Sequence, residues 1–153
     1  SSMGRLFDAA AALMGVAQVA TYEGQAAIQM EALADPDDVK SYPFDIHGNE
    51  LDTTPMWEGL LSDWHSGVEQ HILAARFHNS VTTVLVECCQ KLRLETGIKT
   101  VAFSGGVWQN RYLLERTYRR LREAGFEVLL HRQVPTNDGG LALGQALIAA
   151  INI

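Results

Sequence analysis

Apolar residues recur at helical spacing through the first two thirds of the chain. The pattern predicts one helix from the N-terminal serines to Gly15, a second over residues 24–34 and a third over residues 54–67. Residues 68–95 then keep the helical period for about seven turns. This longest segment is therefore expected to be the central helix of the fold.

The last third of the chain changes to a repeated strand, loop and helix pattern. Strands are expected at 100–103 and 126–130, loops at 104–106 and 135–140, and helices from about Asn110 and over 141–151. Two successive units of this kind imply parallel strands joined by right-handed crossovers. The sequence thus predicts a helix-rich α/β body in one domain, residues 1–153, with short parallel strands near its C-terminus.

One further strand is expected between the second and third helices. Tyr42, Phe44 and Ile46 alternate as in a half-buried strand, and Gly48 and Asn49 then resemble a hairpin turn.

Charge and composition exclude several classes of function. The formal net charge of -6 argues against a nucleic-acid partner, because phosphate binding needs a basic patch. Arg116, Arg119 and Arg120 share a predicted helix with Glu115 and Glu123, which is typical of a solvated helix face. No apolar run is long enough to span a bilayer and no signal-peptide pattern opens the chain, so we expect no membrane contact and a cytoplasmic location.

Cysteines and histidines give weak metal signals. Cys88 and Cys89 are adjacent within a helical pattern, and the spacing favours small buried thiols over a zinc site. His71 and His78 lie seven residues apart on nearly one helix face, so a metal pair is conceivable. Helical ligand pairs more often lie three or four residues apart, so the sequence leaves the roles of these two histidines open.

The two glycine loops are the strongest candidates for chemistry. Gly105 and Gly106 join a strand to a helix, where backbone N–H groups and the helix dipole favour an anion. Asn110 is either a helix cap or a hydrogen-bonding partner of a ligand, and Asp138 is either a cap or a carboxylate presented at the end of a strand. Side by side, the loops would surround one crevice with these four residues, which indicates an anionic ligand such as a nucleotide.

Five ordered strings extend the pattern to a family resemblance. They are SSMGRLFDA (1–9), YEGQAA (22–27), ARFHN (75–79), FSGGVWQNR (103–111) and PTNDGGLALGQA (135–146). Together they resemble the C-terminal region of the HypF family of NiFe-hydrogenase maturation carbamoyltransferases, over nearly the whole chain. The resemblance implies part of an actin-like, Hsp70-like ATPase fold.

The resemblance also implies a reaction and a set of roles. Carbamoyl phosphate and ATP would give carbamoyl adenylate, and the carbamoyl group would pass to the C-terminal cysteine of a HypE-like acceptor protein. Carried over residue by residue, Asp8 and Gly24 would bind the ribose or adenylate, with Glu23 as a further candidate. The nucleotide would lie on Gly105, Gly106 and Asn110. Asp138 would bind a divalent metal ion and act with Asn110 in catalysis, because a metal carboxylate beside a glycine loop neutralises developing charge.

Length is the main departure from the family. Its full enzymes are several times longer, and the acylphosphatase-like, zinc-binding and adenylate-forming parts, with the first half of the actin-like domain, lie upstream of the strings matched here. We therefore expect the chain to be a fragment with little or no transferase activity alone. Apolar surface left uncovered would promote its self-association.

Two other functions fit part of the pattern. The related tRNA threonylcarbamoyladenosine synthases share the fold, but their acceptor RNA is poorly matched to an acidic chain. A non-catalytic nucleotide-binding or partner-binding module would use the long helix with Trp57, Trp64 and Trp108 as a protein surface. Trp57 and Trp64 lie at the helical spacing of core residues, whereas Trp108 beside the glycine loop suits either stacking on an adenine or packing.

Overall fold

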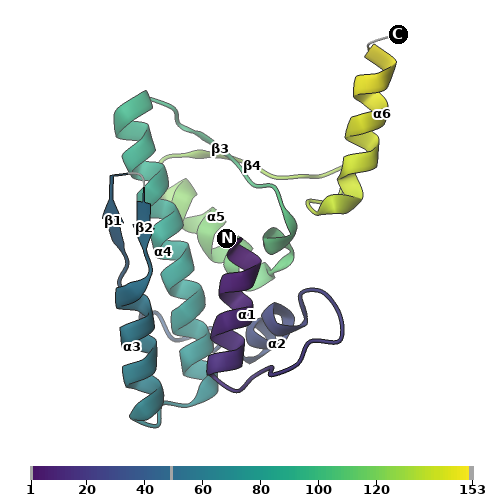
Figure 1. Cartoon of the computed structure of the whole chain (residues 1–153). Coiled ribbons are helices and arrows are strands. Elements are labelled where there is room, and N and C mark those ends of the chain that lie inside the picture. Colours follow the sequence, from purple (N-terminus) through teal and green to yellow (C-terminus); the bar gives the residue numbers. More distant parts are fainter. Residues whose placement is uncertain (1, 49, 152–153) are drawn as a thin grey trace.

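A long central helix organises the computed structural model of the protein, which describes residues 2–48 and 50–151. The shorter helices α1, α2, α3 and α5 pack along α4, and the C-terminal helix α6 projects away from them (Figure 1). The elements in chain order are α1 (Met3–Leu13), α2 (Gln25–Leu33), β1 (Asp45–His47), β2 (Glu50–Asp52), α3 (Thr54–His65), α4 (Gln70–Thr96), β3 (Thr100–Ala102), η1 (Gly106–Gln109), α5 (Arg111–Glu123), β4 (Glu127–Leu129), η2 (Asp138–Gly140) and α6 (Leu141–Ile151).

The main core lies between the first three helices and the N-terminal half of α4. Leu73, Phe77 and Val81 recur every four residues on one face of α4, and all three are fully buried. Phe7 of α1 meets Phe77 edge to face, with ring centroids 5.0 Å apart. The predicted central helix is confirmed, and its apolar stripe is the surface on which the others assemble.

The predicted parallel strands are also confirmed. β3 pairs with β4 in parallel, with Val101 opposite Val128. A second, smaller core lies beneath this pair and against the C-terminal half of α4; its buried members are Val86, Phe103, Leu121 and Phe126. Trp108 stacks on Phe103 with ring centroids 3.7 Å apart and an interplanar angle of 6°, so its indole packs within the fold.

The predicted strand over 42–46 is displaced in the structure. β1 begins only at Asp45 and forms an antiparallel hairpin with β2, while Tyr42 precedes the sheet. Tyr42 is instead held by α4 and α3: its backbone N–H donates to Ser80 Oγ (2.6 Å), and its hydroxyl donates to Asp63 (2.8 Å). Gly48 has the left-handed φ of 62° expected of a hairpin turn, and Asn49 lies outside the described residues.

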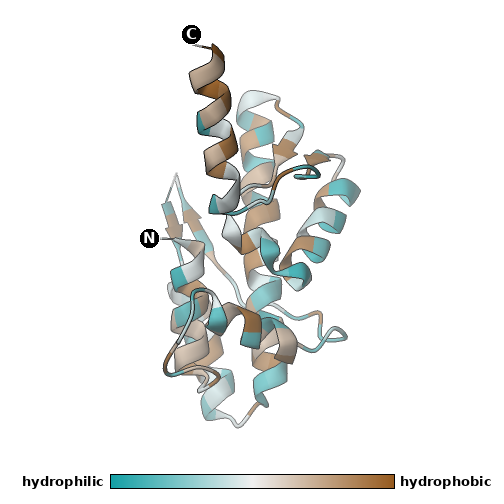
Figure 2. Ribbon diagram, turned by 90° about the vertical axis from the view of Figure 1, so that its right-hand side faces the viewer, coloured by the Kyte–Doolittle hydropathy of each residue, from teal (hydrophilic) through white to brown (hydrophobic). Residues whose placement is uncertain are grey.

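α6 has an apolar surface that the rest of the structure leaves uncovered. Every residue of the helix is exposed, and it contacts chiefly the short turn η2 that precedes it. Figure 2 shows its ribbon as a mostly hydrophobic segment standing clear of the body. Leu143, Leu147 and Ile151 form one stripe and are 59%, 61% and 74% exposed. Among the described helices, none combines the length and apolar character needed to cross a membrane.

We expect the exposed stripe of α6 to cause self-association of the 153-residue chain, because apolar surface of this kind is stabilised by burial. Replacing both Leu143 and Leu147 with Lys should shift the chain to monomer in sedimentation velocity. The matched control is Leu94→Lys, since Leu94 is 87% exposed but lies on α4. A wild-type chain that remains monomeric at high concentration would contradict this expectation.

Candidate functional site

The two glycine loops lie side by side, as the sequence predicts. The Gly105 N–H donates to the Thr136 carbonyl (2.8 Å), and the Thr136 hydroxyl donates back to the Gly105 carbonyl (2.5 Å). Because β3 and β4 are parallel, both loops leave the same edge of the strand pair, which is where open α/β folds bind ligands. The reciprocal hydrogen bonds therefore fix one composite loop.

Gly105 shapes the first loop. Its φ of 102° and ψ of 159° belong to a conformation that only glycine adopts readily. The chain then enters η1, where the N–H groups of Gly106 and Val107 find no acceptor among the described residues. Gly106 is exposed, and a Cβ built on it would have Asn137 Cβ as its nearest neighbour, at 3.9 Å. These two amides can donate to an anion.

Asn110 is confirmed as the N-cap of α5. Its Oδ1 accepts a hydrogen bond from the Leu113 N–H (2.9 Å), and its side chain is buried. Its Nδ2 lies 2.9 Å from Nε2 of His78, a contact that the sequence analysis did not foresee. Asn110 thus ends the glycine loop and connects it to the N-terminal half of α4.

His78 has a defined protonation state in this network. Its Nδ1 lies 2.7 Å from the Ala74 carbonyl, which can only accept, so Nδ1 carries the proton and Nε2 accepts from Asn110. The imidazole is fully buried and meets the rings of Phe7 and Tyr112 at centroid distances of 5.1 and 5.0 Å. Burial lowers the pKa of His78 to about 4. His78 is therefore a neutral hydrogen-bond acceptor in the core.

Glu31 occupies the N-terminus of α5, where the sequence analysis placed a ligand anion. Its Oε1 accepts hydrogen bonds from the N–H groups of Arg111 (2.7 Å) and Tyr112 (3.3 Å). Glu31 lies on α2, about eighty residues away in sequence, so no local sequence pattern predicts this contact. The helix dipole is already matched by a carboxylate of the protein. An anion at the glycine loop must then rely on the free amides of Gly106 and Val107.

The carboxylate of Asp138 is exposed at the start of η2, because the neighbouring Asn137 caps this turn. The Asn137 Oδ1 accepts from the Gly139 N–H (3.1 Å), and the Gly140 N–H donates to the Asn137 carbonyl (3.1 Å). Asp138 is exposed at the start of η2 and makes no side-chain hydrogen bond or ion pair with the described residues. Its carboxylate is free to bind a cation.

Asp8 lies on α1, and Glu23 and Gly24 directly precede the neighbouring helix α2. Asp8 is exposed on α1, one residue after the buried Phe7, and Gly24 is the left-handed N-cap of α2 with a φ of 77°. The two helices pack against each other, and α1 also touches η1. No hydrogen bond or ion pair among the described residues joins these three positions to the glycine loops. All three residues are exposed to solvent.

No complete metal site forms within the described residues. No group of three His, Cys, Asp or Glu side chains converges there. His71 lies 3.3 Å from Glu69 and 3.9 Å from Asp35, while His78 is turned into the core, so the conceivable pair does not form. Cys88 and Cys89 are free, half-buried thiols whose pKa is raised by burial. Asp138 therefore presents a single carboxylate that belongs to no cluster of three such groups within the described residues.

Comparison with known proteins assigns the chain to a family. Residues 1–145 match the family model described as carbamoyltransferase, Kae1-like domain, second subdomain. The carbamoyltransferase HypF of Synechocystis sp. is 38% identical over 152 residues, which cover 96% of this chain and 19% of that protein. A crystal structure of full-length HypF in a phosphate- and nucleotide-bound form is 42% identical with a TM-score of 0.91, over 97% of this chain and 20% of that one.

The fold is accordingly the α/β Kae1-like fold of these neighbours. The chain belongs to the HypF carbamoyltransferase family, and it spans about a fifth of the length of the curated relatives it matches. A tRNA N6-adenosine threonylcarbamoyltransferase of Caldicellulosiruptor bescii is 30% identical over 131 residues, covering 81% of this chain and 38% of that protein. The tRNA-modifying branch is therefore the more distant relative.

The lowered pKa of His78 predicts acid sensitivity. The pKa of His78 is about 4 in the folded chain and 6.5 in the unfolded chain, so the unfolded chain binds the proton more tightly. Lowering the pH from 6.5 toward 4 therefore destabilises the fold. Over this window the free energy of unfolding should fall by about 3 kcal/mol. His78→Gln should flatten this part of the pH profile in denaturant titrations, whereas His65→Gln, on an exposed histidine, should not. An unchanged profile in His78→Gln would show that the imidazole is not the titrating group.

The two glycines of the first loop should respond differently to a methyl group. Gly105→Ala forces alanine to a φ of 102°, so it should lower the free energy of unfolding by about 1–3 kcal/mol. Gly106→Ala meets only an ordinary contact and should change stability little. Urea denaturation of both variants measures the difference. Equal losses of stability in the two variants would show that the backbone angle of Gly105 is not the cause.

Proposed function

We propose that the chain is the C-terminal part, residues 1–153, of the transferase domain of a cytoplasmic hydrogenase-maturation carbamoyltransferase. The full polypeptide would form carbamoyl adenylate from carbamoyl phosphate and ATP, and would pass the carbamoyl group to the C-terminal cysteine of a HypE-like acceptor. The observation that carries this proposal is the composite glycine loop at the end of two parallel strands. Membership of the HypF family supports the choice of reaction.

The nucleotide would bind through backbone donors. Gly106 and Val107 offer two N–H groups that have no acceptor among the described residues, and the lack of a side chain at Gly106 lets a phosphate approach them closely. Asn110, held by His78, fixes where the loop ends and so keeps both amides in place. The HypF neighbour described as phosphate- and nucleotide-bound supports a nucleotide in this role.

Asp138 is the proposed metal ligand of this chain. Its exposed carboxylate starts η2, in the loop that is hydrogen-bonded to the glycine loop. A divalent ion bound there would neutralise negative charge on the phosphate and so favour departure of the adenylate. Because the described residues supply only one ligand, the remaining ligands would belong to other parts of the full polypeptide.

Asp8, Glu23 and Gly24 would then contact the ribose or adenylate from the side of α1 and α2. The packing of α1 against both α2 and η1 supports their placement near the loop. Their exposure leaves each carboxylate free to accept hydrogen bonds from sugar hydroxyls.

Asp138→Asn gives the sharpest test of this proposal, because the residue is exposed and removing its charge should leave the fold intact. In the full-length protein, carbamoyl transfer to the acceptor cysteine should fall by about a hundredfold. Mass spectrometry of the acceptor measures the transfer, in which the thiol displaces AMP from the carbamoyl carbon.

The matched control is Asp45→Asn, which removes an exposed aspartate on the hairpin. Full transfer by Asp138→Asn, with carbamoyl-phosphate-dependent activity present in the wild type, would remove Asp138 from the site. Asn110→Ala is less informative, because loss of the cap would itself destabilise α5.

A further inference from the structure

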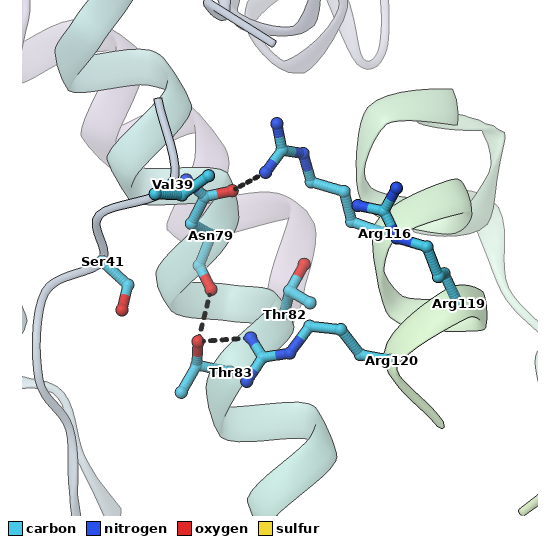
Figure 3. Close-up of a pocket in the computed structure, with 8 residues that line it drawn as sticks. All are labelled: Val39, Ser41, Asn79, Thr82, Thr83, Arg116, Arg119 and Arg120. Atoms are coloured by element: carbon cyan, nitrogen blue, oxygen red, sulfur yellow. Dashed lines mark hydrogen bonds between the residues drawn. The ribbon is translucent and has the colours of Figure 1, made fainter. Parts of the chain in front are cut away.

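A polar pocket lies in the groove between α5 and α4, apart from the glycine loops. It has a volume of about 350 Å³, and Figure 3 shows the side chains around it. Three arginines project from α5, polar side chains come from α4, and a loop segment closes one side. The lining residues are Val39, Ser41, Asn79, Thr82, Thr83, Arg116, Arg119 and Arg120.

The charge of this pocket is one-sided. All three charged residues in the lining are arginines, and none of them forms an ion pair with a described residue. Spacings of three and four residues place like charges next to each other on a helix, and their repulsion destabilises it. This concentration of positive charge occurs in a chain whose net charge is -6. A bound anion would relieve the repulsion.

Two of the arginines are held in place by α4 and its flanking loop. Arg116 donates to Asn79 Oδ1 (3.0 Å) and to the Pro36 carbonyl (2.5 Å), and Arg120 donates to Thr83 Oγ1 (2.7 Å). The charge pattern predicts a solvated helix face for Arg116 and Arg120, and this prediction is wrong because both side chains are half-buried. Each guanidinium has five N–H donors, so these contacts orient the groups without exhausting them.

Arg119 differs from the other two. It is exposed at the edge of the pocket and makes neither a hydrogen bond nor an ion pair with the described residues. It therefore contributes an exposed positive charge to a pocket whose other two cations are oriented by hydrogen bonds. Such an arrangement suits capture of a ligand more than stabilisation of the fold.

We propose that this pocket binds the phosphate or diphosphate group of a small molecule, at a site separate from the glycine loops. Guanidinium groups match phosphate oxygens with paired hydrogen bonds. The hydroxyl of Ser41 lines the same space and can donate to a further oxygen, whereas the Thr83 hydroxyl already donates to the Asn79 carbonyl (2.9 Å). A volume of about 350 Å³ lies at the lower end of the range for small-molecule sites, so it admits a compact phosphorylated metabolite.

The test uses inorganic pyrophosphate and amide NMR of the 153-residue chain. Pyrophosphate should shift the amides of residues 79–83 and 116–120, and added salt should weaken the effect. Arg119→Gln should weaken this binding by roughly tenfold, the effect of one charge-assisted hydrogen bond. Arg122→Gln is the matched control, because it removes an exposed charge from the same helix outside the pocket and should leave binding unchanged.

The remaining outcomes decide against the pocket. Equal weakening in the two variants would mean diffuse attraction to the helix, and shifts confined to residues 104–107 would assign pyrophosphate to the glycine loop alone. Citrate that binds as tightly as pyrophosphate would make the pocket a general anion site and overturn its assignment to phosphate. Loss of transferase activity in Asp138→Asn has no bearing on these shifts, so the two proposals fail separately.

Discussion

A neutral imidazole in the N-terminal half of α4 sets the positions of three helices. His78 donates to the carbonyl of its own helix at Ala74 and accepts from Asn110 at the start of α5, while Phe7 of α1 covers one side of the ring. Each hydrogen bond determines the next: the carbonyl fixes the tautomer, the tautomer fixes the amide of Asn110, and the amide caps α5. Protonation of Nε2 would place two donors against each other, so the fold holds the ring in its neutral form.

Local signals were sufficient for the elements with strong periodicity. The apolar stripe of α4 and the two strand, loop and helix units were predictable because the side chains that define them are neighbours in sequence. The contact between the loops also followed, since parallel strands end at the same edge. The position of Asn110 left a helix cap and a ligand contact open, and the structure shows the cap.

Contacts between distant segments were not predictable in this way. Glu31 reaches the first turn of α5 across about eighty residues, and nothing around it in sequence resembles a capping pattern. Tyr42 leaves the strand pattern because Ser80 and Asp63 hold it. Arg116 and Arg120 flank the buried positions Leu113, Thr117 and Leu121 of α5, a spacing that could have shown them to be half-buried.

The isolation of α6 has a consequence for how the site is completed. The helix meets the body chiefly through η2, and η2 begins with Asp138. Whatever surface covers the apolar stripe of α6 therefore also sets the direction in which this carboxylate points. The free energy released by burying the helix becomes available to order the turn. Under the proposed function, docking of α6 on another surface would therefore be coupled to the orientation of the Asp138 carboxylate.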